Sequence, residues 1–235
     1  MIPLKQAYGS TVGRKLVTGA TGLLLVGFLI THLLGNLTLY KSDGTAFNTY
    51  VEKLHSFGSL LTAAEMGLAG LFIVHILNSL WIARTNARAR PKGYATGLRT
   101  KGGHSRSSVA SRRMAVTGSL LLIFLILHIW QFRFGPGMAE GYTVQLKGEE
   151  VRDLHRLVIE VLRNPLWMGT YVAVMVFLAM HIRHGFWSAF QTLGAMNPRF
   201  NDGVSIAALA LALFLGAGFL FIPVWIYFDL GTVWS

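Results

Sequence analysis

Four histidines lie inside long apolar stretches of the chain, and they carry the strongest chemical signal in the sequence. They are His32, His75, His128 and His181. An ionisable side chain inside a helix of hydrocarbon length is costly to bury, so such a residue usually serves a function. Neutral imidazole is also the commonest metal ligand among side chains. We therefore take the four histidines as candidate ligands of a metal or of a metal-containing cofactor.

The position of each histidine along its apolar stretch sorts the four into two pairs. At about 1.5 Å per residue, His32 and His128 lie about 23 Å from the start of two helices that run outward. His75 and His181 lie about 24 Å from the start of two helices that run inward. We therefore expect an outer pair and an inner pair of imidazoles, at two levels about 16 Å apart.

Small side chains recur on each of these helices about 11 residues from its histidine, at the level of the other pair. Close packing of helices in a membrane is one explanation, because small residues let the backbones approach. The register with the histidines favours another, namely clearance for a wide, flat ligand. The positions are Gly19, Gly22, Ala63, Ala64, Gly67, Thr117, Gly118, Ser119, Gly169 and Thr170.

Two imidazoles at each level restrict the cofactor that can bind there. Zinc takes three or four protein ligands, which is more than one pair supplies. Haem iron is already held by its macrocycle and needs only axial ligands, so two histidines complete it. Helix bundles build cofactor sites from facing side chains in this way. Such a haem has no open position for a substrate, so we expect two haem b groups that carry electrons.

Five apolar stretches position these residues, and each is long enough to cross about 30 Å of hydrocarbon. They cover roughly residues 16–40, 60–83, 114–134, 166–187 and 204–228. The sequence thus predicts an all-α integral membrane protein of one domain, residues 1–235, whose first four spans form an antiparallel haem-binding bundle.

Basic residues predict the orientation of the spans. Segments 1–15, 84–113 and 183–199 carry 14 of the 21 Lys and Arg residues, and Asp202 is the only acidic residue on their side. Lys and Arg concentrate in cytoplasmic loops. We therefore expect a cytoplasmic N-terminus and a C-terminus outside, with the basic 84–113 loop against anionic lipid or a partner subunit.

The composition excludes several classes of protein. The chain is 53% hydrophobic and 13% charged, with a mean hydropathy of +0.50, as is typical of membrane proteins. It has no cysteine, so it can form no disulfide, thiolate metal site, iron–sulfur cluster or thioether-linked haem. The loops account for the net charge of +11, so we do not expect nucleic-acid binding. We also expect no signal peptide, because residues 1–15 are polar.

The segment between the third and fourth spans is predicted to contain a further helix. In VRDLHRLVIEVLRN, apolar residues recur at helical spacing, which predicts an amphipathic helix along the outer surface. They are Val151, Leu154, Val158 and Val161/Leu162. Pro165 then suits the first turn of the fourth span.

The histidine stretches resemble a known family. FLITHLLGN, LFIVHILNSLWIA, LILHIWQFR and HIRHGFWSAFQTLG are similar to the histidine helices of the five-helix, two-haem cytochrome b subunit of succinate:quinone oxidoreductases. This family includes the succinate dehydrogenases and fumarate reductases. The resemblance covers nearly the whole chain and depends mainly on the order and spacing of the helices. It implies that helices one and three hold the outer haem and helices two and four the inner one. This agrees with the two levels inferred from the position of each histidine along its helix.

The resemblance also implies partners and a function. In the family, a flavoprotein with covalently bound FAD interconverts succinate and fumarate, and a subunit with iron–sulfur clusters docks on the cytoplasmic face. The chain would anchor both in the bacterial inner membrane as the quinone-reactive subunit, with menaquinone as the expected quinone, and would have no dicarboxylate site of its own. The family pattern favours His181 as the ligand, with Arg183 and His184 nearer the propionates or the partner subunit.

Glu65 is the only acidic residue well inside a predicted span. It lies 10 residues, or about 15 Å, outward of His75 and therefore near the outer level. The cost of burying a carboxyl favours a function such as proton relay for a quinone, with a hydrogen bond inside the bundle as the alternative. His55 and His155, in outer segments, are weaker candidates for contact with a propionate or a quinone, and we expect His104 to be solvated.

Two rival functions use the same histidines. A proton or metal transporter would need ionisable groups at several depths along one path, and often repeated or interrupted helices. The pairing at two levels and the lack of a clear internal repeat argue against it. A two-haem cytochrome b of another quinone-linked dehydrogenase differs from the first proposal only in its partner.

Overall fold

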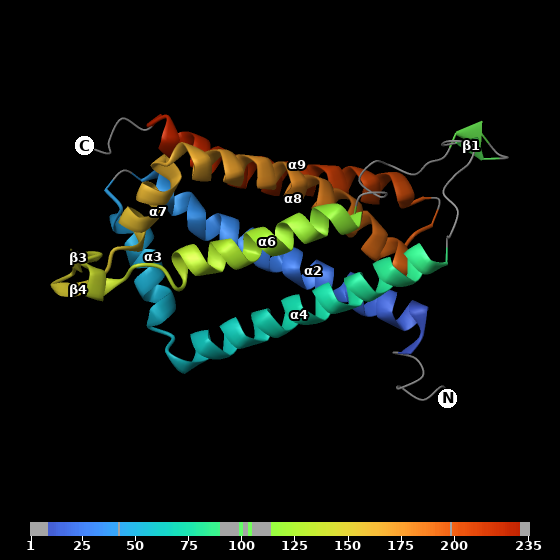
Figure 1. Cartoon of the computed structure of the whole chain (residues 1–235), viewed down its shortest axis with the longest axis horizontal. Coiled ribbons are helices and arrows are strands. Elements are labelled where there is room, and N and C mark those ends of the chain that lie inside the picture. Colours follow the sequence, from blue (N-terminus) through green and yellow to red (C-terminus); the bar gives the residue numbers. More distant parts are fainter. Residues whose placement is uncertain are drawn as a thin grey trace.

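Five long helices dominate the protein. The structure is a computed structural model that describes residues 9–41, 43–89, 99–100, 103–104, 114–197 and 199–230. Within these residues five helices are long and apolar enough to cross a membrane (Figure 1). They are α2 (Thr11–Asn36), α4 (Ser59–Arg88), α6 (Met114–Phe132), α8 (Pro165–Thr192) and α9 (Asn201–Tyr227). The five predicted spans are therefore confirmed as helices, although α4 and α8 each continue five residues beyond the predicted end.

Local signals in the sequence explain where two of these helices begin. The Ser10 hydroxyl accepts a hydrogen bond from the Gly13 N–H at 3.0 Å and caps α2. The Asn164 side chain accepts from the N–H of Leu166 at 3.0 Å and of Trp167 at 3.3 Å, and Pro165 occupies the first position of α8, as predicted.

The helices pack around α2 and α8. Helix α2 contacts α4 and α8, α6 contacts α8, and α9 lies alongside α8 (Figure 1). The α8–α9 contact is close because Gly216 faces α8: a Cβ added there would lie 2.6 Å from Cβ of Ala179. Leu33 on α2 and Leu215 on α9 are almost wholly buried in the resulting core. Large apolar side chains on the outer faces, such as Leu77, remain exposed, as expected for surfaces that face lipid.

Short elements gather at one end of the molecule (Figure 1). They are η1 (Leu37–Tyr40), α3 (Thr45–His55), η2 (Met138–Glu140), β3 (Thr143–Leu146), β4 (Glu149–Arg152) and α7 (Leu154–Arg163). The amphipathic helix is thus shorter than predicted, because Val151 pairs with Val144 across the β3–β4 hairpin. Lys147 and Gly148 close that hairpin with φ values of 53° and 88°, and Asp153 then caps α7 by accepting from the Arg156 N–H.

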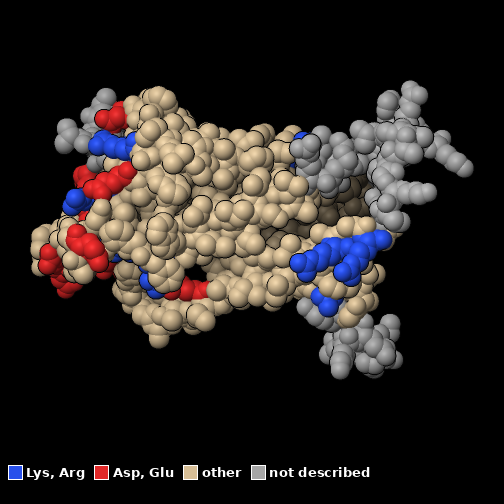
Figure 2. All heavy atoms as spheres, in the orientation of Figure 1, with Lys and Arg blue, Asp and Glu red and all other residues tan. Residues whose placement is uncertain are grey.

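The described charges divide between the two ends. Where α2 begins and α4 ends, Figure 2 shows Lys and Arg, and Asp202 lies at the same end in the first turn of α9. Asp and Glu gather instead at the end that carries α7 and the hairpin. Strands β1 (Arg99–Thr100) and β2 (Gly103–His104) pair within the basic loop. The rest of that predicted loop, 90–98, 101–102 and 105–113, lies outside the described residues. The sidedness of the protein in a membrane stays a prediction.

The first four long helices form two similar halves. In each half a long helix is followed by a short helix at the hairpin end and then by a second long helix, as α2–α3–α4 and α6–α7–α8. This arrangement makes α2 and α6 run in one direction and α4 and α8 in the other (Figure 1). Helix α9 follows outside this pattern.

Candidate cofactor-binding site

The outer pair of histidines meets between α2 and α6. The ring centroids of His32 and His128 lie 5.9 Å apart, and the ring planes are almost perpendicular at 86°. Phe28, one turn before His32, stacks on it at 5.3 Å, and Phe124 stacks on His128 at 5.6 Å. The prediction that these two side chains lie at one level, made from their positions along the helices, is therefore confirmed. Their role as ligands stays a prediction.

The inner pair belongs to α4 and α8. His75 and His181 lie close enough for charges on their rings to interact. Each ring also faces a glycine on another helix. A Cβ added at Gly22 would lie 3.2 Å from Cε1 of His75, and one added at Gly118 would lie 3.3 Å from Cε1 of His181. These two glycines make room for the imidazoles themselves.

A threonine hydroxyl holds His75. The Thr21 Oγ1 lies 3.1 Å from Nδ1 of His75. This hydroxyl already has carbonyl acceptors for its proton within its own helix, at 2.8 Å in Val17 and 3.1 Å in Thr18. Its oxygen is therefore left to accept a hydrogen bond from Nδ1–H of the imidazole.

His181 has the same arrangement on the other half of the bundle. The Thr117 Oγ1 lies 3.3 Å from Nδ1 of His181 and donates its own proton to the Met114 carbonyl at 3.1 Å. Thr117 is buried, with 3% of its surface exposed, so water does not compete for this contact. The Thr117 oxygen is thus also placed to accept from Nδ1–H.

For His128, the oxygen beside Nδ1 belongs to a tyrosine. The Tyr171 phenol oxygen lies 3.1 Å from Nδ1 of His128, and its proton goes to Oε1 of Gln131 at 2.8 Å. Both Tyr171 and Gln131 are buried. The phenol oxygen, like the two threonine oxygens, is therefore an acceptor for Nδ1–H.

These contacts determine which ring nitrogen is free. We assign the proton of His75, His128 and His181 to Nδ1 from their hydrogen-bonding partners. In that tautomer Nε2 carries the lone pair that a metal binds. An imidazole whose N–H donates to an oxygen is also fixed in orientation and is a stronger metal ligand.

His32 is held differently. The Nδ2 of Asn36, one turn further along α2, lies 3.5 Å from both ring nitrogens and donates to the His32 carbonyl at 2.8 Å. An amide nitrogen only donates, so it cannot accept a proton from the ring. The contacts of His32 therefore do not select its tautomer as those of the other three histidines do.

Helices α2 and α6 share a sequence pattern that corrects the expectation of no clear internal repeat. From Thr21 to His32 and from Thr117 to His128, eight of twelve positions are identical, including the Thr-Gly pair at the start and the histidine at the end. The two segments place the same residue types at the two levels. Each helix thus offers an imidazole at the outer level and a hydroxyl beside a glycine at the inner level.

The five glycines among the small residues predicted to leave clearance fall into three groups. Gly22 and Gly118 face the inner imidazoles, whereas Gly19 packs against Ala189, where an added Cβ would lie 3.4 Å from the Cα. At Gly67 and Gly169 an added Cβ would meet no atom within 4 Å. Gly67 and Gly169 thus leave open space at the outer level, whereas Gly19 serves the close packing of α2 against α8.

Glu65 has a partner that the sequence did not indicate. Its Oε2 lies 3.2 Å from Nη2 of Arg133, just beyond the end of α6. Arg133 follows His128 by five residues, so its backbone lies about 8 Å outward of that of His128 along α6. No sequence signal pairs residues so far apart.

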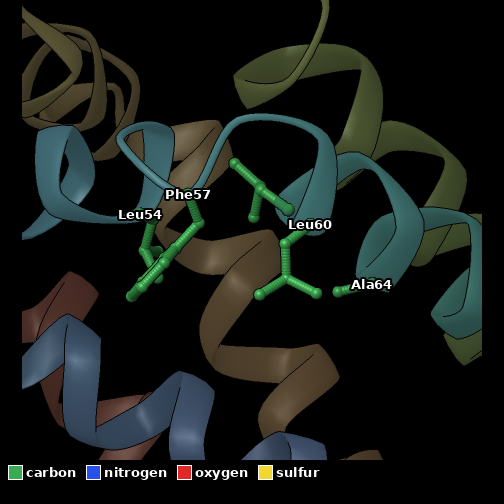
Figure 3. A pocket seen from close by; sticks show the side chains of 5 residues that line it. Leu54, Phe57, Leu60 and Ala64 are labelled. Atoms are coloured by element: carbon green, nitrogen blue, oxygen red, sulfur yellow. The ribbon is translucent and has the colours of Figure 1, made fainter.

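An apolar hollow of ≈ 240 Å³ lies at the same end of the molecule, where α3 turns into α4 (Figure 3). The side chains that line it come from both helices and from the turn between them. They are Leu54, Phe57, Leu60, Leu61 and Ala64. Ala64 is the residue before Glu65, so the hollow is next to the ion pair along α4.

The remaining candidates on α8 differ in exposure. Arg183 is exposed and His184 is half-buried, with its ring centroid 6.3 Å from that of Trp187. A cation that the sequence reasoning did not select lies near the inner pair: Arg14 donates to Oδ1 of Asn78 at 3.3 Å, and its Cζ lies 4.3 Å from the ring centroid of Trp81.

The two outer-segment histidines have local partners. Nδ1 of His55 lies 3.4 Å from Oε1 of Glu52. His155 is buried beside Phe47, and burial lowers its pKa below the ordinary value. The contact of either residue with a propionate or a quinone stays a prediction.

The arrangement suits a cofactor that needs two protein ligands. In the described ranges, no three or more of the residue types His, Cys, Asp and Glu gather into a group that could hold a metal ion. Each level offers two imidazoles instead. No family model, curated protein or solved structure matches the chain.

Proposed function

We propose that the chain binds two haem b groups, one between each pair of histidines, and acts as the membrane-anchor cytochrome b of a succinate:quinone oxidoreductase. The observation that carries the proposal is the pairing of imidazoles, three of which have Nδ1 beside a hydroxyl oxygen whose own proton has another acceptor. That contact leaves Nε2 for a metal. The family resemblance supplies the choice of partner enzyme.

The geometry of the outer pair fits this cofactor. Metals of this kind bind an imidazole nitrogen at about 2.0 Å, so two rings on opposite sides of one iron have centroids about 6 Å apart. The centroids of His32 and His128 are 5.9 Å apart. A haem held by two histidines transfers single electrons and does not bind substrate at its iron.

The chain's own residues would then hold the cofactors and shield them. His32 and His128 would bind the outer group, and His75 and His181 the inner one. Phe28 and Phe124 stack against the outer imidazoles and limit their rotation. Arg14, at the inner end of α2, is a candidate to compensate the charge of propionates there.

We propose that the quinone reacts at the outer end, beside Glu65. Its carboxyl can accept and release a proton, and it forms a partly exposed ion pair with Arg133. The apolar hollow at Leu60 and Ala64 offers the kind of surface that a hydrophobic ring or tail prefers. The iron–sulfur and flavoprotein subunits would dock at the opposite end, where the described charges are basic.

One experiment tests both the cofactor and the enzyme. The chain, with an affinity tag, is purified with its partners from the membranes of its host, and succinate is added anaerobically. We expect co-purification of a protein with covalent flavin and reduction of both haems by succinate. Haems that succinate does not reduce, without a flavoprotein, would instead favour the cytochrome b of another dehydrogenase. A preparation without haem would contradict the proposal altogether.

A further inference from the structure

We propose that Thr117, Tyr171 and Thr21 are positioning residues, which hold three of the four imidazoles in the tautomer and orientation needed to bind haem. This inference rests on the proposed function. It assigns a role to three hydroxyl groups on neighbouring helices, none of which binds iron itself.

The direction of each hydrogen bond is the first argument. Each hydroxyl has a nearer or equally near acceptor for its own proton: a carbonyl for the two threonines and the Gln131 amide oxygen for Tyr171. The lone pairs of these oxygens then face Nδ1 at 3.1 to 3.3 Å. A proton on Nδ1 satisfies this contact, whereas a proton on Nε2 would place two acceptors against each other.

The origin of each hydroxyl is the second argument. Thr21 on α2 faces a histidine of α4, Thr117 on α6 faces one of α8, and Tyr171 on α8 faces one of α6. Each bond therefore joins two helices and fixes a ring relative to the bundle rather than only to its own helix. The two threonines also occupy equivalent positions in the repeated pattern, each followed by the glycine that admits the imidazole.

Ordinary helix packing is the alternative explanation. A threonine in a membrane helix commonly donates to a carbonyl of the preceding turn and needs no other partner. Thr31 is such a residue, because its hydroxyl donates to the Phe28 carbonyl at 2.9 Å and its side chain is exposed. Thr31 thus provides a matched control on the same helix as Thr21.

Loss of the acceptor should have a specific effect. In Thr117→Val the Nδ1–H of His181 would lack a partner in a medium of low dielectric constant, and the proton could move to Nε2, where it blocks metal binding. Removing such a partner of a metal-bound histidine typically weakens metal binding by about 10- to 100-fold. The imidazole would also donate less electron density, so the midpoint potential of the remaining inner haem should rise.

The test compares haem content and the midpoint potentials of the two haems in five variants of the purified complex. Thr117→Val should change only the inner haem, and Tyr171→Phe only the outer one, so the unaffected haem shows that the chain is folded. Thr117→Ser, which keeps the hydroxyl, should restore wild-type values, and Thr31→Val should match the wild type. Thr21→Val, like Thr117→Val, should change only the inner haem.

Three outcomes would overturn the inference. If the wild type holds two haems and Thr117→Val has wild-type haem content and potentials, the proposed function stands but the positioning role is wrong. If Thr117→Val disturbs both haems equally, or Thr117→Ser fails to restore the inner one, packing explains the effect. If the wild type holds no haem, the proposed function fails and the inference fails with it.

Discussion

At the scale of single residues, two histidines one turn apart on α8 are candidates for the same ligand position of the proposed inner haem. His181 faces the glycine and hydroxyl of α6 and lies near His75, whereas His184 faces Trp187. The choice of His181 rather than His184 as the ligand stays a prediction.

This difference predicts the result of two substitutions. His181→Ala should remove the inner haem and leave the outer one, because His75 alone supplies a single axial ligand. His184→Ala should retain both haems. The haem content of each variant, measured by absorption against protein concentration, checks this. Loss of a haem in His184→Ala together with two haems in His181→Ala would show that the ligand was assigned to the wrong residue.

The ion pair between Glu65 and Arg133 leads to a prediction about quinone chemistry. Glu65→Gln removes the group that takes up or releases a proton but keeps its size, so the rate of quinone turnover should fall by about 10²-fold or more. Both haems should stay bound, and succinate should still reduce them. Glu52→Gln, which alters another carboxylate at the same end, serves as the control and should retain activity. Full turnover in Glu65→Gln would exclude the proton role.

At the scale of elements, one contact joins the two halves at the hairpin end. The Asn48 amide of α3 donates to Asp153 at 2.8 Å, and its oxygen accepts from the N–H of His155 at 3.0 Å. The His155 ring lies against Gly44, where a Cβ would come within 2.6 Å of Nδ1. This side chain therefore packs α7 against the start of α3.

The burial of His155 predicts a dependence of stability on pH. Burial lowers the pKa of His155 below 6.5, although Asp153 and Asp43 oppose this shift. The unfolded chain then binds the proton more readily, so the contribution of His155 is fully present above its unfolded pKa and is lost as the pH falls below about 6.5. Thermal unfolding in detergent should show a smaller decrease between about pH 7.5 and pH 5 in His155→Gln than in the wild type. Equal pH dependence in the two proteins would refute this.

The elements also show what the sequence could predict. The spans were predicted well because hydropathy over about 20 residues is a local property. The common level of His32 and His128 could also be predicted locally, because the rise per residue of a helix is constant. The contacts of Thr117 and Tyr171 with imidazoles depend instead on the rotation of each helix about its axis. Glu65 and Arg133 are brought together only by the packing of α4 and α6, and no pattern within either helix indicates that.

At the scale of the whole molecule, the long helices give the protein two ends, one where α2 begins and one that carries the β3–β4 hairpin. Lys15 lies exposed near the start of α2, and Lys147 lies exposed in the turn of the hairpin at the opposite end. The positive-inside rule predicts that the first end faces the cytoplasm. In the proposed function, soluble partners dock at that end and the quinone reacts at the other.

The lack of cysteine makes the orientation simple to test. Lys147→Cys should react with a membrane-impermeant maleimide on intact spheroplasts, whereas Lys15→Cys should react only after the membrane is opened. The wild type, without a thiol, is the control for background. The reverse pattern would place the basic end outside and would contradict the proposed docking of the dehydrogenase.

The haem content of the purified chain tests the central claim most directly. Four histidines at two levels, with the contacts described above, predict two low-spin b haems per chain, which appear in one absorption spectrum and titrate at two midpoint potentials. Protein-normalised pyridine haemochrome measurements should therefore give a ratio of two haems to one chain. A ratio of zero in folded protein prepared with sufficient haem would contradict the account, whatever other activity the chain proved to have.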